Sequence, residues 1–161
     1  GWALPASIGS CCSVEAHHFC LVGDGALMMS IQELATLKKH SLPITVIIFN
    51  NNGYSMIKQT QEQWFDGEYF ASGGADLEFP SFASIANSFG LGFSRVNQLD
   101  EFDGALEKAI RQSLPNIIEV VVHEGTRVIP QVRFGRPNED MEPLLEREVF
   151  LEHMIISPIN Q

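Results

Sequence analysis

One acidic residue and one amide residue follow two predicted strands, and together they could bind a metal ion. The acidic residue is Asp24, which is flanked by glycines, and the amide is Asn51, at the centre of three consecutive asparagines. Both side chains offer hard oxygen atoms, and Gly53 could add a main-chain carbonyl oxygen. Three such oxygens, two phosphate oxygens and one water would complete the octahedron that Mg²⁺ prefers. These residues therefore predict a site for a magnesium ion that carries a phosphate.

The sequence around these residues is typical of a strand, a helix and a second strand. Residues 18–22 form a short, largely apolar run that stops at the glycine-flanked turn, as a buried strand does. From Ala26 the apolar residues recur at helical spacing, until the basic residues 38–40 and then Pro43 end the helix. Residues 44–49 are apolar and rich in β-branched side chains, which indicates a central parallel strand.

The lengths of these elements bring the two polar residues together. A helix of about 14 residues rises about 21 Å, and a strand of about six residues covers roughly 20 Å in the opposite direction. The chain returns to the edge that it left, so we expect Asp24 and Asn51 to lie close together. Ligands of open α/β sheets bind at the carboxyl ends of strands, where the first N–H groups of a helix also point. Gly25 lacks the side chain that would block a close approach.

Longer motifs around these residues make the chain resemble a known family. The motifs are Gly23-Asp24-Gly25, Gln32-Glu33-Leu34-Ala35-Thr36, Leu42-Pro43 and Asn50-Asn51-Asn52-Gly53-Tyr54-Ser55-Met56-Ile57. They resemble the C-terminal diphosphate-binding domain of thiamine-diphosphate enzymes, in the acetolactate synthase-like group. Residues 1–9 and 80–90 extend the likeness over nearly the whole chain. Ser30, Ser55 and His123 depart from the usual family pattern, and none of them is a predicted metal ligand.

The resemblance implies two cofactors, thiamine diphosphate and Mg²⁺, and assigns residues to them. The metal ligands would be the side chains of Asp24 and Asn51 and the carbonyl of Gly53. The cofactor site would comprise Gly23, Asp24, Gly25, Ala26, Asn51, Gly53, Tyr54, Ser55 and Met56. Main-chain N–H groups near Gly25 and Tyr54 would hold the diphosphate, and Met56 would lie beside the reactive region. No residue of this chain receives a catalytic role.

The resemblance also implies a reaction class and a partner. These enzymes act on 2-keto acids by decarboxylation and carboligation, as transferases or lyases. A glutamate that activates the cofactor belongs to a pyrimidine-binding domain of the same or another chain, commonly across an interface of a homo-oligomer such as a dimer or tetramer. No segment of this chain matches that domain. We therefore expect half of an active site, inactive alone, in either a fragment of a longer polypeptide or the small subunit of a two-chain 2-keto acid decarboxylase.

Two other functions stay open at this point. The chain could be a non-catalytic module that binds the cofactor or serves assembly. It could also belong to an unrelated phosphate-handling α/β enzyme that uses Asp24 as an acid. Asp24 by itself is an ordinary turn residue, and the asparagines by themselves are an ordinary polar loop. The case for a cofactor site depends on their falling at neighbouring strand ends.

Length and composition limit the classes of protein. A chain of 161 residues is about one domain long, and 45% hydrophobic residues suffice for a core. A net charge of −10 without a basic cluster argues against a nucleic-acid surface, so a metal ion and backbone N–H groups must neutralise a bound diphosphate. No apolar run approaches a membrane span. Cys11, Cys12 and Cys20 fit buried reduced thiols better than disulfides or a zinc site, which predicts a cytoplasmic protein.

These elements predict an α/β fold of three layers, in which a doubly wound, mainly parallel sheet carries helices on both faces. The cofactor domain is expected at residues 1–125, and residues 126–161 form a C-terminal tail that packs on the domain or on a partner. Further strands are predicted at 92–96 and 117–122. Between them we expect a helix capped by Asn97. Its apolar stripe, expected in the core, is Leu99, Phe102, Leu106, Ile110 and Leu114.

Overall fold

The computed structural model describes residues 1–112, 114–133 and 135–158. Residues 134 and 159–161 of the predicted tail lie outside this description. The chain divides into two compact units, Gly1–Thr126 and Arg127–Gln161. Among the described residues, no helix has the length and apolar character that crossing a membrane requires.

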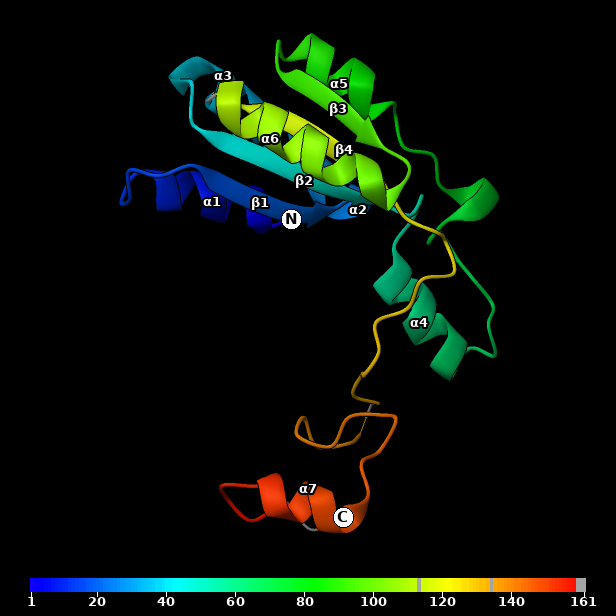
Figure 1. The fold of residues 1–161 in the computed structure, drawn as a ribbon. Helices are drawn as coiled ribbons and strands as arrows, with labels where there is room; N and C mark the ends of the chain where they lie inside the picture. Colours follow the sequence, from blue (N-terminus) through cyan, green and yellow to red (C-terminus); the bar gives the residue numbers. More distant parts are fainter. Residues whose placement is uncertain (113, 134, 159–161) are drawn as a thin grey trace. The chain divides into compact units, whose positions relative to one another are not determined.

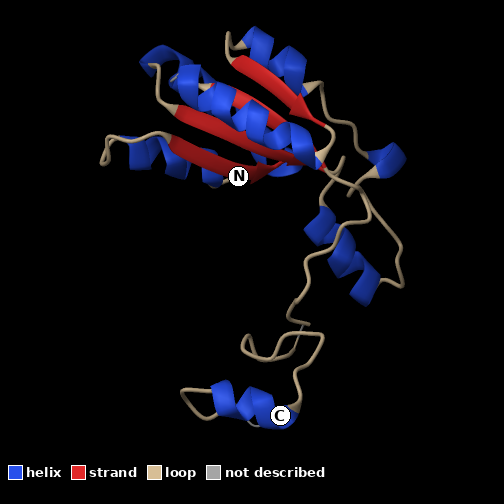
Figure 2. Cartoon of the chain, in the orientation of Figure 1, coloured by secondary structure: helices blue, strands red, loops and turns tan. Residues whose placement is uncertain are grey.

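A sheet of four parallel strands forms the centre of the first unit (Figure 2). In chain order the strands are β1 (His18–Gly23), β2 (Ile44–Asn50), β3 (Gly92–Val96) and β4 (Asn116–Val121), and across the sheet their order is β1-β2-β4-β3. The predicted central position of β2 is confirmed. Because β1 pairs with β2 so that Gly23 lies opposite Phe49, the residues that follow these two strands emerge at the same edge.

Four helices contribute to the larger apolar core on one face of the sheet. They are α1 (Ala3–Cys11), α2 (Asp24–Met28), α3 (Leu34–His40) and α5 (Phe82–Ser88). Their buried side chains, including Leu4, Leu27, Leu37 and Ile85, pack with strand residues such as Val46. Since these residues are apolar and fully or almost fully buried, this core supplies a large share of the free energy that holds the site in place.

The helix predicted after the glycine-flanked turn is interrupted. Helix α2 starts at Asp24 itself and ends at Met28, and a 3₁₀ turn, Ile31–Glu33, leads into α3. Ser30 lies between them with φ −134°, outside the helical region. Serine is a weak helix former because its hydroxyl competes for backbone hydrogen bonds. The prediction of one continuous helix is therefore wrong, although the segment still returns the chain to the same edge of the sheet.

Helix α6 (Phe102–Gln112) packs on the opposite face (Figure 1). The side chains of α6 that face the sheet recur every three or four residues and pack against the buried Ile47 and Ile118. These side chains are Phe102, Ala105, Leu106 and Ala109. Helices on both faces of a parallel sheet confirm the predicted α/β class. On the edge strand β1, Phe19 and Leu21 point to this face and are 44% and 59% exposed, so β1 is only half-buried.

The prediction for α6 is wrong in its cap and in part of its stripe. The helix is preceded by a 3₁₀ turn, Leu99–Glu101, whose capping box joins Gln98 to Glu101, so the capping residue is Gln98 and not Asn97. Of the predicted core stripe, Leu99, Ile110 and Leu114 are exposed. The buried face is centred on the small residue Ala109, which the choice of large apolar residues overlooked.

Helix α4 (Ser55–Trp64) follows directly from the asparagine loop, and Figure 1 shows it beyond the carboxyl ends of the strands. The chain then passes back along this loop, where Gly73 pairs with Gly53 in an isolated antiparallel bridge. A 3₁₀ turn, Gly74–Asp76, follows. The loop after β2 is thus held by α4 on one side and by the returning chain on the other.

The second unit contains helix α7 (Arg147–His153) and an isolated bridge between Gln131 and Glu142. The guanidinium of Arg147 donates two hydrogen bonds of 3.0 Å to the carboxylate of Asp140, which is 3% exposed. The same guanidinium lies 4.7 Å from the ring centre of Phe150. A charged pair and an aromatic contact therefore organise this small unit.

Candidate cofactor and metal site

Asp24 lies at the carboxyl end of β1 and is 2% exposed. Its Oδ1 accepts the N–H of Gly25 at 2.7 Å, and its Oδ2 accepts the N–H groups of Asn51 and Gly53, each at 3.1 Å. The predicted proximity of Asp24 and Asn51 is confirmed. Burial raises the pKa of Asp24, and the backbone hydrogen bonds of the two loops act against that rise.

No cationic side chain in the described part of the chain pairs with this buried carboxylate. Among the described residues, the ion pairs of lysine, arginine and histidine involve other acids, and the hydrogen bonds to Asp24 come from the backbone. A buried charge is ordinarily paired or bound to a metal ion. Asp24 therefore has the character of a cation ligand.

The side-chain oxygen of Asn51 is buried and has no hydrogen-bond partner among the described residues. Buried polar atoms nearly always have a partner, so an unsatisfied carbonyl oxygen calls for an explanation. The N–H of the same residue is bound to Asp24 at 3.1 Å. A hard cation satisfies both a carboxylate without a cation and a carbonyl oxygen without a donor, so this pair of residues fits Mg²⁺.

Gly53 lies buried where the loop meets the returning chain. A Cβ on Gly53 would lie 2.6 Å from the carbonyl oxygen of Ser72, and one on Gly73 would lie 2.4 Å from Nζ of Lys58. Position 53 therefore requires glycine, because the obstacle is backbone, whereas at position 73 the flexible end of Lys58 would have to move aside. Lys58 is only 9% exposed and brings a positive charge to this loop. The sequence pattern did not single out Lys58, because a lysine in the first turns of a helix is ordinarily solvated.

Gly25 lies against the ring of Tyr54. A Cβ on Gly25 would lie 2.2 Å from Cε1 of that ring. The ring also meets Phe79 edge-on, with centroids 5.8 Å apart, and the N–H of Tyr54 donates to the carbonyl of Ser72 at 2.8 Å. The glycine-flanked turn and the start of α4 are thus in direct contact, and the space beside Gly25 is filled by an aromatic ring.

The remaining predicted site residues lie at the starts of two helices. Gly23 immediately precedes α2, and Ala26 lies in the first turn of α2. Ser55 begins α4, and Met56 follows it with 57% of its surface exposed. The first N–H groups of a helix have no partner within the helix. Through the contact between Gly25 and Tyr54, the structure brings both helix starts to the same edge of the sheet.

The cysteines and histidines add no second site. Among the described residues, no group of three or more His, Cys, Asp or Glu side chains could hold a metal ion. The three cysteines are free, and Cys12 is exposed. The expectation of buried thiols is confirmed for Cys20, while Cys11 is only half-buried. It is wrong for Cys12, because α1 ends at Cys11 and leaves the next residue on the surface.

Fold and site together define a class of protein. It is a doubly wound α/β domain with a buried acid, an unsatisfied amide oxygen and two helix starts at the carboxyl edge of its sheet. Residues 1–120 match the family described as thiamine pyrophosphate enzyme, C-terminal TPP binding domain. The chain belongs to this family, which confirms the resemblance seen in the sequence.

Curated proteins similar to this chain include acetolactate synthases. The chain is 32% identical over 142 residues to the acetolactate synthase large subunit of Parasynechococcus marenigrum (strain WH8102), covering 88% of this chain and 23% of the relative. It is 30% identical over 142 residues to the acetolactate synthase isozyme 2 large subunit of Escherichia coli (strain K12), covering 88% of this chain and 26% of the relative. The chain thus spans about a quarter of the length of these relatives.

A solved structure supports the fold. The thiamine diphosphate-dependent 4-hydroxybenzoylformate decarboxylase of Rhodococcus jostii RHA1 superposes with a TM-score of 0.69, over 76% of this chain and 23% of that one. The sequence identity is 24%, so this likeness concerns the fold alone.

Proposed function

We propose that this chain binds the diphosphate of thiamine diphosphate through a magnesium ion at the carboxyl edge of β1 and β2. The observation that carries the proposal concerns Asn51, whose N–H donates to the buried Asp24. Its side-chain oxygen, Oδ1, is buried and has no hydrogen-bond partner among the residues that the structure describes. Asp24 and the Asn51 side chain would bind the ion, with the carbonyl of Gly53 as the third protein ligand. Membership of the TPP-binding family supports this reading.

Other residues of the edge would bind and orient the diphosphate. N–H groups at the start of α2, in the segment Gly23, Gly25 and Ala26, and at the start of α4, in the segment Tyr54, Ser55 and Met56, would donate to its oxygens. The N–H groups of Gly25 and Tyr54 are excepted, because they donate to Asp24 and to the carbonyl of Ser72. The buried ammonium of Lys58 would add one positive charge in a chain whose net charge is −10. The exposed side chain of Met56 would lie beside the reactive region.

The reaction proposed for the whole protein is that of an acetolactate synthase-like transferase or lyase. Thiamine diphosphate, when bound, supplies the chemistry by which a 2-keto acid loses its carboxylate and forms a new carbon–carbon bond. This chain would contribute the anchor, while the activating glutamate would come from a pyrimidine-binding domain of the same or another chain. We propose a dimer or tetramer in the cytoplasm, with residues 126–161 packed on the domain or on a partner.

A binding experiment tests the anchor. The 161-residue chain is titrated with thiamine diphosphate, with and without Mg²⁺, alone and with a pyrimidine-binding domain added. Asp24→Ala should abolish the metal-dependent part of binding, and Asp100→Ala, which removes an exposed acid, should leave it intact. Unchanged binding by Asp24→Ala would refute the metal assignment, and tighter binding of a simple phosphate ester would favour an unrelated phosphate enzyme.

An activity experiment tests whether this chain supplies only half of the active site. The chain alone, with thiamine diphosphate and Mg²⁺, should not turn over pyruvate, because no glutamate of this chain is assigned to activate the cofactor. Turnover by the pure chain would contradict the half-site. Cofactor binding without turnover after addition of the missing domain would favour a non-catalytic assembly module.

A further inference from the structure

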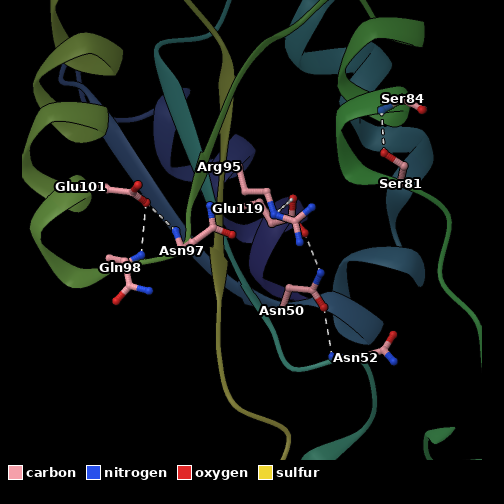
Figure 3. Close-up of polar contacts among 9 residues, drawn as sticks. All are labelled: Asn50, Asn52, Ser81, Ser84, Arg95, Asn97, Gln98, Glu101 and Glu119. Atoms are coloured by element: carbon pink, nitrogen blue, oxygen red, sulfur yellow. Dashed lines mark hydrogen bonds and ion pairs between the residues drawn. The ribbon is translucent and has the colours of Figure 1, made fainter.

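A chain of hydrogen bonds connects β4 to the asparagine loop (Figure 3). Glu119 on β4 is 4% exposed, and its Oε1 accepts Nδ2 of Asn50 at 2.6 Å. Oδ1 of Asn50 in turn accepts the N–H of Asn52 at 3.0 Å. On the other side, Arg95 of β3 pairs with Glu119 in the sheet register and places Nε 3.8 Å from its Oε2.

Glu119 decides which way the amide of Asn50 faces. A carboxylate can only accept hydrogen bonds, so the NH₂ group of Asn50 must point to Glu119 and its oxygen must point to the loop. Hydrogen bonds with an ionised partner are shorter and stronger than neutral ones, so this orientation is well held. The Asn50 oxygen is therefore always presented to the N–H of Asn52.

This bond shapes the loop that carries the proposed metal ligands. A side-chain oxygen that accepts the N–H two residues on forms a tight turn, and Asn52 adopts the left-handed φ of 56°. With this turn in place, the N–H groups of Asn51 and Gly53 both reach Oδ2 of Asp24. The orientation of Asn50 thus helps to determine where the two ligand residues of the loop lie.

The sheet itself does not require an acid at this position. The β2 residue paired with Glu119 is the buried Ile48, and Ile117 on the same strand also lies in the core. Burying a carboxylate there costs free energy, and the ion pair with Arg95 offsets little of it because the side chain of Arg95 is 55% exposed. An apolar residue would pack better at this position, which indicates that Glu119 has a role other than packing.

We propose that Glu119 is a positioning residue that, through Asn50, holds residues 51–53 in the conformation that binds the metal ion. The proposal rests on the magnesium site proposed above and adds a residue from a different strand to it. Glu119 has no contact with the cofactor in this role and acts only through the loop.

The test uses variants that change the direction of the hydrogen bonds. Glu119→Gln replaces a group that can only accept with one whose NH₂ can also face Asn50, so the direction of the Asn50 amide is no longer fixed. Asn50→Asp sets two carboxylates face to face. In the double variant, the new glutamine amide can donate to the new aspartate, whose second oxygen accepts the N–H of Asn52, so each hydrogen bond is kept. Glu101→Gln is the matched control, because exposed Glu101 accepts N–H bonds of 2.7 and 3.1 Å away from the loop (Figure 3).

Two readouts are measured on the 161-residue chain. The first is amide hydrogen exchange at Asn52 without metal, and the second is Mg²⁺ affinity, from competition with Mn²⁺ in the presence of thiamine diphosphate. We expect each single variant to exchange faster at Asn52 and to bind Mg²⁺ about tenfold more weakly, the lower end of what outer partners of metal ligands contribute. The double variant should recover most of both, and Glu101→Gln should change neither.

The outcomes separate this inference from the function on which it rests. Wild-type Mg²⁺ affinity in Glu119→Gln would overturn the inference alone. A double variant no better than the single ones would overturn the argument from hydrogen-bond direction. A wild-type chain that binds no Mg²⁺ would refute the proposed metal site, and this inference with it.

Discussion

Replacing Asp24 with asparagine should separate the stability of the chain from its metal binding. The carboxylate accepts three backbone N–H groups, one at Oδ1 and two at Oδ2. Asparagine has one oxygen, which can serve the two N–H groups of Asn51 and Gly53. Its NH₂ group then faces the N–H of Gly25, and that hydrogen bond is lost.

The expected change in stability is small because two effects oppose each other. Losing one hydrogen bond to a charged acceptor costs about 1.5–3 kcal/mol. Against this, Asn removes a charge that is 2% exposed, and burial raises the pKa of Asp24, so the folded state disfavours the ionised form. Desolvation of a buried ion is also worth several kcal/mol. The free energy of unfolding without metal should therefore change by no more than about 1 kcal/mol.

Asp24→Ala provides the contrast. It also removes the charge, but it leaves all three N–H groups without their acceptor, at about 1 kcal/mol or more for each. We therefore expect Asp24→Ala to unfold at lower urea than Asp24→Asn. Both variants lose the carboxylate ligand, so both should bind Mg²⁺ more than about 100-fold more weakly. This loss exceeds the one that follows when a residue that only supports a metal ligand is replaced.

The assays are urea unfolding without metal, followed by circular dichroism, and Mg²⁺ titration in the presence of thiamine diphosphate. Asp100→Asn, at an exposed acid, is the matched control and should resemble the wild type in both. Wild-type Mg²⁺ affinity in Asp24→Asn would refute Asp24 as a ligand. Equal destabilisation by Asp24→Asn and Asp24→Ala would refute the claim that the three backbone hydrogen bonds to Asp24 stabilise the fold.

Three further predictions concern stability. Gly25→Ala places Cβ 2.2 Å from Cε1 of Tyr54 and should cost about 1–3 kcal/mol by overpacking; Tyr54→Leu in the same chain should recover part of it in thermal melting. Burial lowers the pKa of His17, so the unfolded state takes up protons first and the chain loses stability as the pH falls below about 6.5. As the pH is lowered below about 6.5, the urea midpoint of the wild type should fall relative to that of His17→Gln. A difference between the two midpoints that stays constant with pH would contradict this. Arg147→Met removes two hydrogen bonds to the buried Asp140. Because the side chain of Arg147 is 49% exposed, solvent screens the pair, so the change should cost the second unit about 1–2 kcal/mol and speed amide exchange in α7, whereas unchanged exchange would show that the pair does not hold the helix.

Local patterns in the sequence were enough for the strands and for the class of fold. Residues 44–49 and 117–122 were recognised because apolar, β-branched runs between turn residues have few other structures. The same reasoning failed for α6, where Leu99 and Ile110 are exposed and Ala109 is buried. Which side of a helix meets a sheet depends on the register of the packed elements, and small residues in the contact leave little signal in a list of large apolar ones.

The sequence by itself determined the parallel βαβ unit, the meeting of Asp24 with Asn51, and membership of the TPP-binding family, because each depends on residue types at short spacing along the chain. Only the tertiary structure decided that Oδ1 of Asn51 finds no donor in the described part of the chain, that Lys58 is buried beside the loop, and that Glu119 turns the amide of Asn50 toward Asn52. Those features join residues from different strands and helices. Burial and hydrogen bonding are properties of the surroundings in space, and no local pattern of residues specifies them.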